Sequence, residues 1–524
     1  MKLRTIVKIA ITSSVVLLCS GFALYSFFRL SAAEGQKDFN LYELVPSTTL
    51  AVFVTDDVLE FVAEVDELTC SKNQQYLYVS KLFSYLKQSL YALSEDTPHG
   101  LSRQMNQMLI SFHEPDNERN QVLYCRLGNG DKELVNRFVR KYISSLYPPK
   151  TFIYKGEEII IYPMADGDFL ACYLTSDFMA LSFQKKLIEN VIDAYKSGKS
   201  LADDSTFTGI RAPKKSAAAA TIYTRMQGMM GWTEFDMKMK DDFIYFSGIT
   251  HDADTCFAFI NQLRQQQSVK GFPGEVLPST AFYFSRQGIT DWVSLLSYGN
   301  AQGQSVPART SEVQNRDKEF SRYLMENAGQ DLVACLFQRE DTLQGAAAVL
   351  SLSVADVTEA ERMLRALVNA ASADEGRRNP RITFCYTVNK AYPIYRLPQT
   401  TLFEQLTSFA EPTLDVYAAF YGGRLLLAPD ADALAHYIRQ LDKGEVLNGA
   451  MAYQTGMDHL SDSYHFMLMA DFDHIFQQSE NHVRFVPDFF LRNADFFRHF
   501  TLFVQFACAD GMVYPNTVSY THLT

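Results

Sequence analysis

The sequence has little of what usually identifies an active site. It contains no Gly-x-Ser-x-Gly nucleophile elbow, no Gly-x-Gly-x-x-Gly or Walker A phosphate loop, and no His-x-x-x-His or His-Glu-x-x-His zinc pattern. These absences argue against the common serine hydrolases, nucleotide-binding enzymes and zinc enzymes. We therefore expect no cofactor and no bound metal, and assign no catalytic residue.

Cysteine is also sparse, with eight residues in 524 and no Cys-x-x-Cys pair. Four lie in strand-like apolar runs, which predicts that they are small buried side chains: Cys125, Cys172, Cys335 and Cys385. A disulfide scaffold is not expected, and any one or two bridges cannot be paired from the sequence.

Basic residues are too few for a nucleic-acid-binding protein. Lys and Arg total 48 against 60 Asp and Glu, a net charge of −12. The first 29 residues hold four basic and no acidic residues, so the charge beyond them becomes −16. A chain with this acidic charge is not expected to bind nucleic acid, nor to bind anionic lipid through a cluster of basic residues.

Only one apolar run is long enough to span a bilayer, Ile9–Phe28. Its twenty residues follow a basic tail, residues 1–8, and precede a linker, residues 29–42. We favour an uncleaved signal anchor in the inner membrane, with the bulk of the chain in the periplasm. A cleaved signal peptide with a site at 31–33 and a lipoprotein signal at Cys19 are the alternatives.

Self-comparison reveals a long internal repeat. Residues 45–48 (VPST) recur as 277–280 (LPST), and 152–154 recur as 384–386, both at an offset of 232. Residues 192–198 match 438–444 at an offset of 246. Collinear matches of this kind predict two tandem copies of a unit of about 230 residues, covering 43–270 and 271–524.

Each copy alternates runs of strands with amphipathic helices, which indicates an α+β fold with largely antiparallel sheets. Turns are expected at Lys155–Gly156, Gly422–Gly423 and Asp510–Gly511, and helix C-caps at Gly198 and Gly444. The helix that follows 244–250 has no counterpart after 513–518. We expect the second copy to be truncated, and Val518–Thr524 to be an artefact of sequence assembly.

Few residues are candidates for a site. Trp232 and Trp292 are the best candidates for an exposed apolar contact, with core packing as the alternative. Asp471, Asp473 and His474 form the densest group of ligand types, but an N-cap Asp beside a surface His explains them as well. Ser182 and Lys185 have Ser-x-x-Lys spacing, which is common by chance.

Other charged pairs have simpler explanations. The acidic pairs at 56–57, 203–204 and 241–242 are interpreted as turn and capping residues rather than a calcium loop. The basic pairs at 214–215 and 377–378 are isolated.

The arrangement resembles the DUF3352 family of uncharacterised bacterial proteins, particularly those of Bacteroidetes. The resemblance is carried by the membrane-anchored start, Leu44–Thr48 before a strand, and the segment Ile192–Leu201. It implies a membrane-anchored envelope protein and brings no catalytic residues.

The function predicted from these features is non-enzymatic: a membrane-tethered periplasmic protein that binds an envelope partner or acts as a scaffold. Two alternatives remain open, an envelope hydrolase with a site assembled from dispersed residues, and a carrier of lipid or another hydrophobic ligand.

Overall fold

The structure is a computed structural model. It describes residues 39–68, 105–114, 119–128, 131–138, 147–164, 167–211, 218–225, 231–240, 242–250, 258–293, 295–296, 311–339, 345–374, 382–388, 390–407, 413–478, 486, 490–491 and 494–521. The apolar run Ile9–Phe28 and the basic pairs at 214–215 and 377–378 lie outside these ranges. Among the described residues, no helix has the length and apolar character needed to cross a membrane.

In the first half of the chain, the described residues form ten antiparallel strands. They are β1 (Ala51–Thr55), β2 (Met108–Phe112), β3 (Gln121–Arg126), β4 (Lys150–Tyr154), β5 (Glu157–Pro163), β6 (Phe169–Leu174), β7 (Phe178–Ser182), β8 (Ala220–Thr224), β9 (Thr233–Lys240) and β10 (Phe243–Thr250). Their order across the sheet is β4-β5-β6-β7-β3-β2-β1-β8-β9-β10. The accompanying helices are η1 (Leu41–Glu43), α2 (Val58–Glu67), α4 (Asp131–Phe138), α5 (Lys185–Ser197) and α6 (Ser205–Ile210).

The described residues of the second half repeat this order with ten further strands. They are β12 (Ala281–Gly288), β13 (Ala328–Gln338), β14 (Ala346–Val354), β15 (Ile382–Tyr386), β16 (Ala391–Arg396), β17 (Tyr417–Tyr421), β18 (Arg424–Ala428), β20 (Phe466–Asp471), β21 (Phe500–Ala509) and β22 (Met512–Thr521). Their order is β15-β16-β17-β18-β14-β13-β12-β20-β21-β22, so every pairing of the first half has a counterpart.

Helices and a small sheet complete the second half. The helices are α9 (Ser311–Asn327), α10 (Val357–Asp374), α11 (Leu402–Leu406), α12 (Ala431–Lys443), α13 (Met451–Met457), α14 (Phe472–Phe476) and α16 (Ala494–Phe497), with η4 (Pro273–Glu275) and η5 (Leu447–Gly449). The segment between the halves contains α7 (Ala258–Gln265) and β11 (Val269–Lys270), and β11 pairs with β19 (Ser463–Tyr464). This confirms the α+β class.

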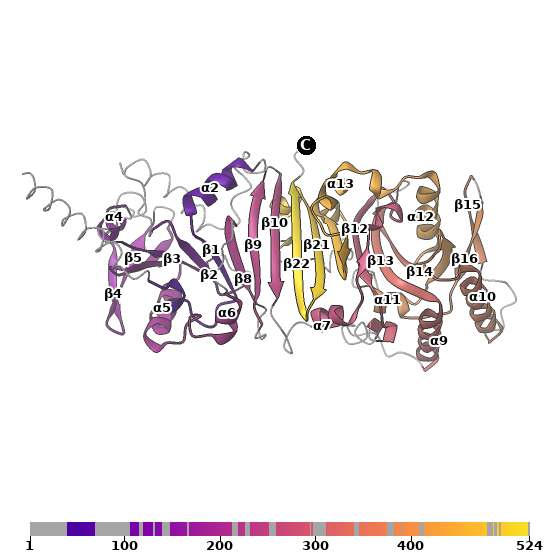
Figure 1. Cartoon of the computed structure of the whole chain (residues 1–524), viewed down its shortest axis with the longest axis horizontal. Helices are drawn as coiled ribbons and strands as arrows, with labels where there is room; N and C mark the ends of the chain where they lie inside the picture. Colours follow the sequence, from indigo (N-terminus) through magenta and orange to yellow (C-terminus); the bar gives the residue numbers. More distant parts are fainter. Residues whose placement is uncertain are drawn as a thin grey trace, which may run out of the picture.

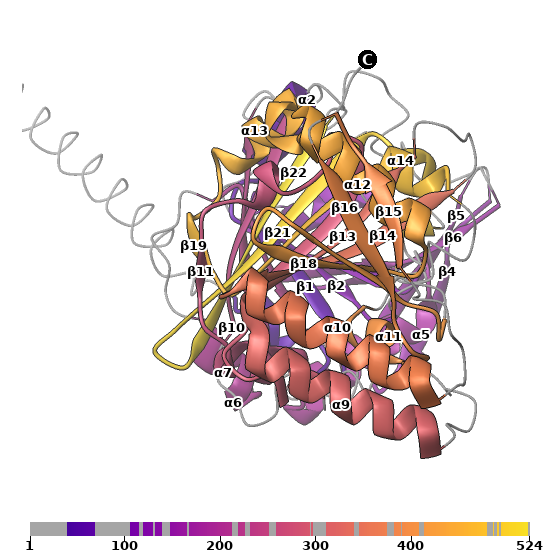
Figure 2. The same cartoon turned by 90° about the vertical axis from the view of Figure 1, so that its right-hand side faces the viewer.

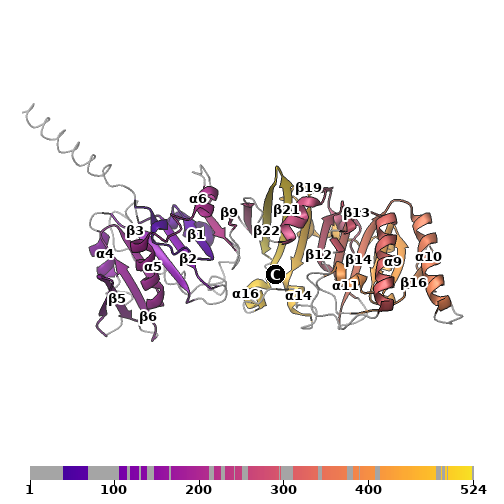
Figure 3. The same ribbon diagram turned by 90° about the horizontal axis from the view of Figure 1, so that it is seen from below.

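The two halves share one sheet, an arrangement that the repeat by itself did not specify. β10 pairs antiparallel with β22, and this pairing makes a continuous sheet of 20 strands (Figures 1 and 3). Ser247 faces Asn516, and each is the fifth residue of its strand. The junction therefore joins equivalent strands around a local two-fold axis at this residue pair.

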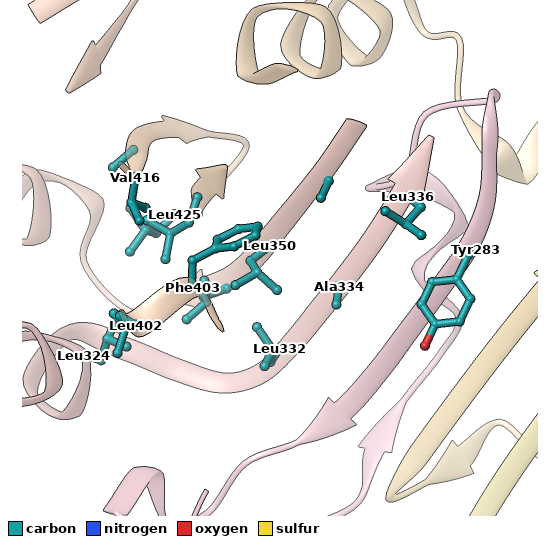
Figure 4. Packing of buried hydrophobic residues seen from close by; sticks show 14 of the residues in the cluster. Tyr283, Leu324, Leu332, Ala334, Leu336, Leu350, Leu402, Phe403, Val416 and Leu425 are labelled. Carbon is teal, nitrogen blue, oxygen red and sulfur yellow. The ribbon is translucent and has the colours of Figure 1, made fainter. Parts of the chain in front are cut away.

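Helices cover both faces of the sheet. In the second half α9, α10 and α11 lie on one face, and α12 and α13 lie on the other (Figure 2). Leu332, Leu350 and Leu425 of the sheet pack against Phe403 of α11 in one of these cores (Figure 4). In the first half, α2 and α4 lie on one face and α5 and α6 on the other.

The expected turns and caps are present where glycine or its neighbour adopts a left-handed conformation. Lys155–Gly156, Gly422–Gly423 and Asp510–Gly511 have positive φ in the two-residue loops of hairpins. Gly198 (φ 63°) and Gly444 (φ 77°) end α5 and α12. The prolines of the two recurring Pro-Ser-Thr motifs make equivalent bridges, Pro46 to Ser200 and Pro278 to Val446.

One predicted correspondence is shifted by one residue. The sequence pattern aligns Phe152–Tyr154 with Phe384–Tyr386, but the strand pairing aligns Ile153 with Phe384 and Tyr154 with Cys385. A shift of one residue exchanges the two faces of a strand. Tyr154 bonds to Asp193 of α5, and Cys385 contacts Ala435 of α12, so these two share a face.

Part of the segment predicted to be an assembly artefact belongs to the sheet. Val518–Thr521 form the end of β22, where Val518 is buried and pairs with Tyr245 of β10 and Phe503 of β21. His522 and the two residues after it lie outside the described part of the chain.

Candidate functional site

The two tryptophans are core residues and do not form an exposed contact. Trp232 is 1% exposed and packs edge-on against Phe207 at 5.0 Å. Arg225 lies 4.7 Å from the indole ring and donates from Nε to the Thr49 carbonyl at 3.0 Å, which ties β8 to the Pro-Ser-Thr turn. Trp292 is 6% exposed and belongs to the core beneath α9 and α10.

Asp471 and His474 form a helix N-cap and not a metal site. The Asp471 carboxylate accepts from the backbone N–H groups of Asp473 and His474, at the N-terminus of α14. His474 Nδ1 lies 3.0 Å from Asp471 Oδ2, and this bond raises the pKa of His474. Among the residues that the structure describes, no three His, Cys, Asp or Glu side chains converge as metal ligands would.

Ser182 and Lys185 do not form a catalytic pair. Ser182 is buried and donates to the Gln121 carbonyl at 2.8 Å. The Lys185 ammonium is bound by Glu189 and lies over the Phe152 ring. Two of the acidic pairs supply a helix cap: Asp57 accepts from Glu60 N, and Asp204 accepts from Thr206 N and Phe207 N. Of the third pair, residue 241 lies outside the described part of the chain.

The four predicted core cysteines are buried free thiols: Cys125, Cys172, Cys335 and Cys385. Burial raises the pKa of Cys125 and Cys172 to about 12, so both remain protonated and unreactive near neutral pH.

A buried charge cluster in the second half could not be found from the sequence. Asp331 of β13 is 7% exposed and accepts from Arg286 Nε of β12 at 3.1 Å and from Arg424 Nη1 and Nη2 of β18 at 3.3 and 3.2 Å. Arg424 also donates to Ser351. These residues come from separate strands, and only the sheet pairing brings them together on the face that packs against α12.

This cluster fixes the segment that joins the two halves. Arg286 Nη1 donates to the Gly271 carbonyl at 2.7 Å and to the Tyr464 hydroxyl at 3.2 Å, and Tyr464 donates to the same carbonyl. Each guanidinium therefore has several acceptors, which is the arrangement that buried charges require. Val54 and Phe178 occupy the equivalent places in the first half, so the cluster is not duplicated.

A second polar group, in the first half, contains a serine–histidine contact. Ser111 Oγ lies 2.9 Å from His113 Nε2 and 3.0 Å from the Tyr124 hydroxyl. Ser111 and Tyr124 are fully buried, so a substrate cannot reach Ser111 without an opening of the sheet. Burial lowers the pKa of His113 to about 4, which keeps the imidazole neutral near pH 7.

The low pKa of His113 predicts a loss of stability in acid. An unfolded His has a pKa near 6.5, so the unfolded state binds more protons than the folded state between about pH 6.5 and 4. The contribution of His113 is fully present above this window and falls by roughly 3 kcal/mol as the pH decreases through it. We expect His113→Gln to remove this part of the pH dependence in urea unfolding measured at pH 7 and 4.5.

His474 provides the internal control. Because its folded pKa is raised, its contribution is present at low pH and is lost as the pH rises through that pKa. His474→Gln should therefore change the slope of stability against pH in the opposite direction. Equal slopes for the wild type and His113→Gln would show that His113 protonates freely in the folded chain.

Most of the exposed large apolar residues of the sheet lie on its two outermost strands, and Phe169 of β6 is the exception. We call β4 and β15 the end strands; among the described strands each has a single neighbour, β5 or β16. Ile153 of β4 is 71% exposed, and Phe384 and Tyr386 of β15 are 53% and 73% exposed. Ile153 and Phe384 occupy equivalent positions, so both halves present a large apolar side chain at the same place.

No family model, curated protein or solved structure matches this chain.

Proposed function

We propose that this protein is a membrane-tethered envelope protein that binds a partner or acts as a scaffold, with the end strands as its contact surfaces. The single observation that carries the proposal is the exposed apolar residue at the same position of both end strands. An outermost strand has backbone groups free for pairing along its outer edge, and exposed apolar side chains on it favour the addition of another strand. The resemblance to the DUF3352 family, together with the apolar run Ile9–Phe28 and the basic residues before it, supports the tether and the periplasmic location.

The polar groups are better explained by structure than by catalysis. Asp331 and its two arginines hold the segment between the halves, and Ser182 and Asp471 bond to backbone groups. The serine–histidine contact is the observation that best favours the hydrolase alternative. The complete burial of Ser111 weighs against it, because a nucleophile has to reach its substrate.

Site-specific photo-crosslinking in intact cells tests the proposal. A photoreactive residue replaces Tyr386 on the end strand, and a matched one replaces Met451, which is 81% exposed at the start of α13. We expect a reproducible crosslink to an envelope component from position 386 and none from position 451. The absence of any crosslink at position 386, with the chain present in the membrane fraction, would contradict the proposal.

A further inference from the structure

The two end strands lie at opposite ends of one continuous sheet. β4 is the outermost described strand of the first half and β15 that of the second half (Figure 1). Because both halves have the same strand order, β4 and β15 are equivalent strands. A contact between them within one molecule is ruled out by the 18 strands that separate them in the 20-stranded sheet.

The end strands lack the features that usually protect a sheet edge. Natural edges carry charges, prolines or bulges that prevent pairing with another chain. β15, with the sequence ITFCY, has neither a charge nor a proline, and β4, with KTFIY, has one charge at its first residue. Four of the five residues of β4 are exposed, as are three of the five in β15.

The molecule already shows how equivalent outer strands of this fold associate. β10 of the first half pairs antiparallel with its equivalent β22 of the second half, around the Ser247–Asn516 pair. Main-chain pairing is joined there by a side-chain hydrogen bond from Ser247 to Asn516 and by contact between the Phe243 and Tyr520 rings, and helices of both halves flank the interface (Figure 3). A two-fold relation of the same kind at the opposite end of each half would pair β4 of one molecule with β15 of another.

We infer that β4 of one chain pairs antiparallel with β15 of a second copy of this chain, so that the sheet continues from molecule to molecule. The inference rests on the proposed function, since it names the partner of the end strands. Because the two strands lie at opposite ends, the contact is head-to-tail and gives a linear assembly rather than a closed dimer.

The faces of the sheet determine which side chains meet. Tyr154 and Cys385 point to the face that carries α5 and α12, so Ile153 and Phe384 point to the opposite face. An assembly that keeps each face continuous places Ile153 of one chain beside Phe384 of the next. Such cross-strand apolar pairs are a main source of stability in sheets.

Mixed cysteine crosslinking of the full chain in detergent tests this contact. Two variants, Ile153→Cys and Phe384→Cys, are oxidised separately and as a mixture, and wild type controls for the native cysteines. We expect the mixture to give about tenfold more crosslinked dimer than either variant alone, and the doubly substituted chain to give a ladder of multimers. Equal dimer from one variant alone, or none from the mixture, would overturn the head-to-tail contact.

Introducing a charge at position 384 provides a second test of the contact. Phe384→Lys should lower the multimeric fraction about tenfold in light scattering, because a lysine would be buried without a partner in the contact. Met451→Lys, which changes an equally apolar exposed residue away from the ends, should leave this fraction unchanged.

The inference and the proposed function fail in different ways. A photo-crosslink from position 386 to another envelope protein, without disulfide ladders, would overturn self-association and leave the scaffold role standing. No crosslink of either kind would contradict both.

Discussion

Asp331→Asn is expected to lower the free energy of unfolding by about 3–5 kcal/mol, because it leaves two buried guanidinium groups without their shared carboxylate. Arg286 and Arg424 both donate to Asp331, and their side chains are 15% and 13% exposed. They would then face each other in a region that water barely reaches. Urea unfolding of the full chain in detergent at pH 7 measures the loss.

A surface pair of the same chemistry serves as the control. Arg396 and Asp415 are 2.8 Å apart, and their side chains are 41% and 48% exposed. Exposed pairs contribute up to about 1 kcal/mol, so Asp415→Asn should have a small effect. If Asp331→Asn also cost less than about 1 kcal/mol, the cluster would not stabilise the segment between the two halves as described.

The same cluster predicts a dependence on pH. Burial alone would raise the pKa of Asp331, but Arg424, Ser353 and Arg286 outweigh it and hold the pKa below its ordinary value. The stability contributed by this carboxylate is therefore present above the pKa of an unfolded aspartate, near 3.9, and is lost as the pH falls through the lower folded value.

Gly248→Val is expected to separate the unfolding of the two halves. A Cβ on Gly248 would lie 2.7 Å from Phe235 Cδ1 and 2.8 Å from both Pro515 Cγ and the Glu234 carbonyl oxygen. Gly248 thus leaves room for the Pro515 ring where β10 meets β22. Valine should cost about 3 kcal/mol, and because the damage lies at the junction, calorimetry should show two transitions in place of one.

Gly209→Val is the matched control for this substitution. Gly209 lies in α6, and apart from its chain neighbours and the backbone of its own helix no atom approaches within 4 Å of the position that its Cβ would take. The variant should unfold within about 1 kcal/mol of the wild type, with the halves still coupled. An unchanged single transition for Gly248→Val would mean that the junction contributes little to the cooperativity of the chain.

Local signals in the sequence were sufficient for turns, caps and the class of fold. Gly198 and Gly444 follow amphipathic helices, and Asp510–Gly511 separates two alternating strands, so short-range sterics decide these features. The repeated pattern of such signals also indicated two similar halves, and the strand order is the same in both.

Features that depend on strand register are harder to predict from the sequence. The Thr-Phe-x-Tyr pattern of the end strands aligned Phe152 with Phe384, whereas the sheet aligns Ile153 with Phe384. A one-residue shift of this kind leaves the apolar composition of a strand intact, so self-comparison could not detect it. Exposure of Ile153 and Phe384 follows from the outermost place of their strands in the sheet, which no local pattern specifies, so the sequence pointed to the rarer Trp232 and Trp292.

The charge cluster was missed for a different reason. Arg286, Asp331 and Arg424 are separated by 45 and 93 residues, and no spacing rule relates them. Only the pairing of β12, β13, β14 and β18 brings them together. Internal repetition is the one sequence signal that could have revealed the cluster. The first half has no equivalent cluster, so this signal is absent.

The pairing of β10 with β22 also sets the order of events during synthesis. About 270 residues separate the starts of the two strands, and chains grow at about 5–20 residues per second. The edge of β10 therefore stays unpaired for roughly 15–50 seconds, until β22 has been synthesised. An unpaired edge of this kind invites association with other chains, so a newly made first half is the stage at which we expect chaperones to be needed most.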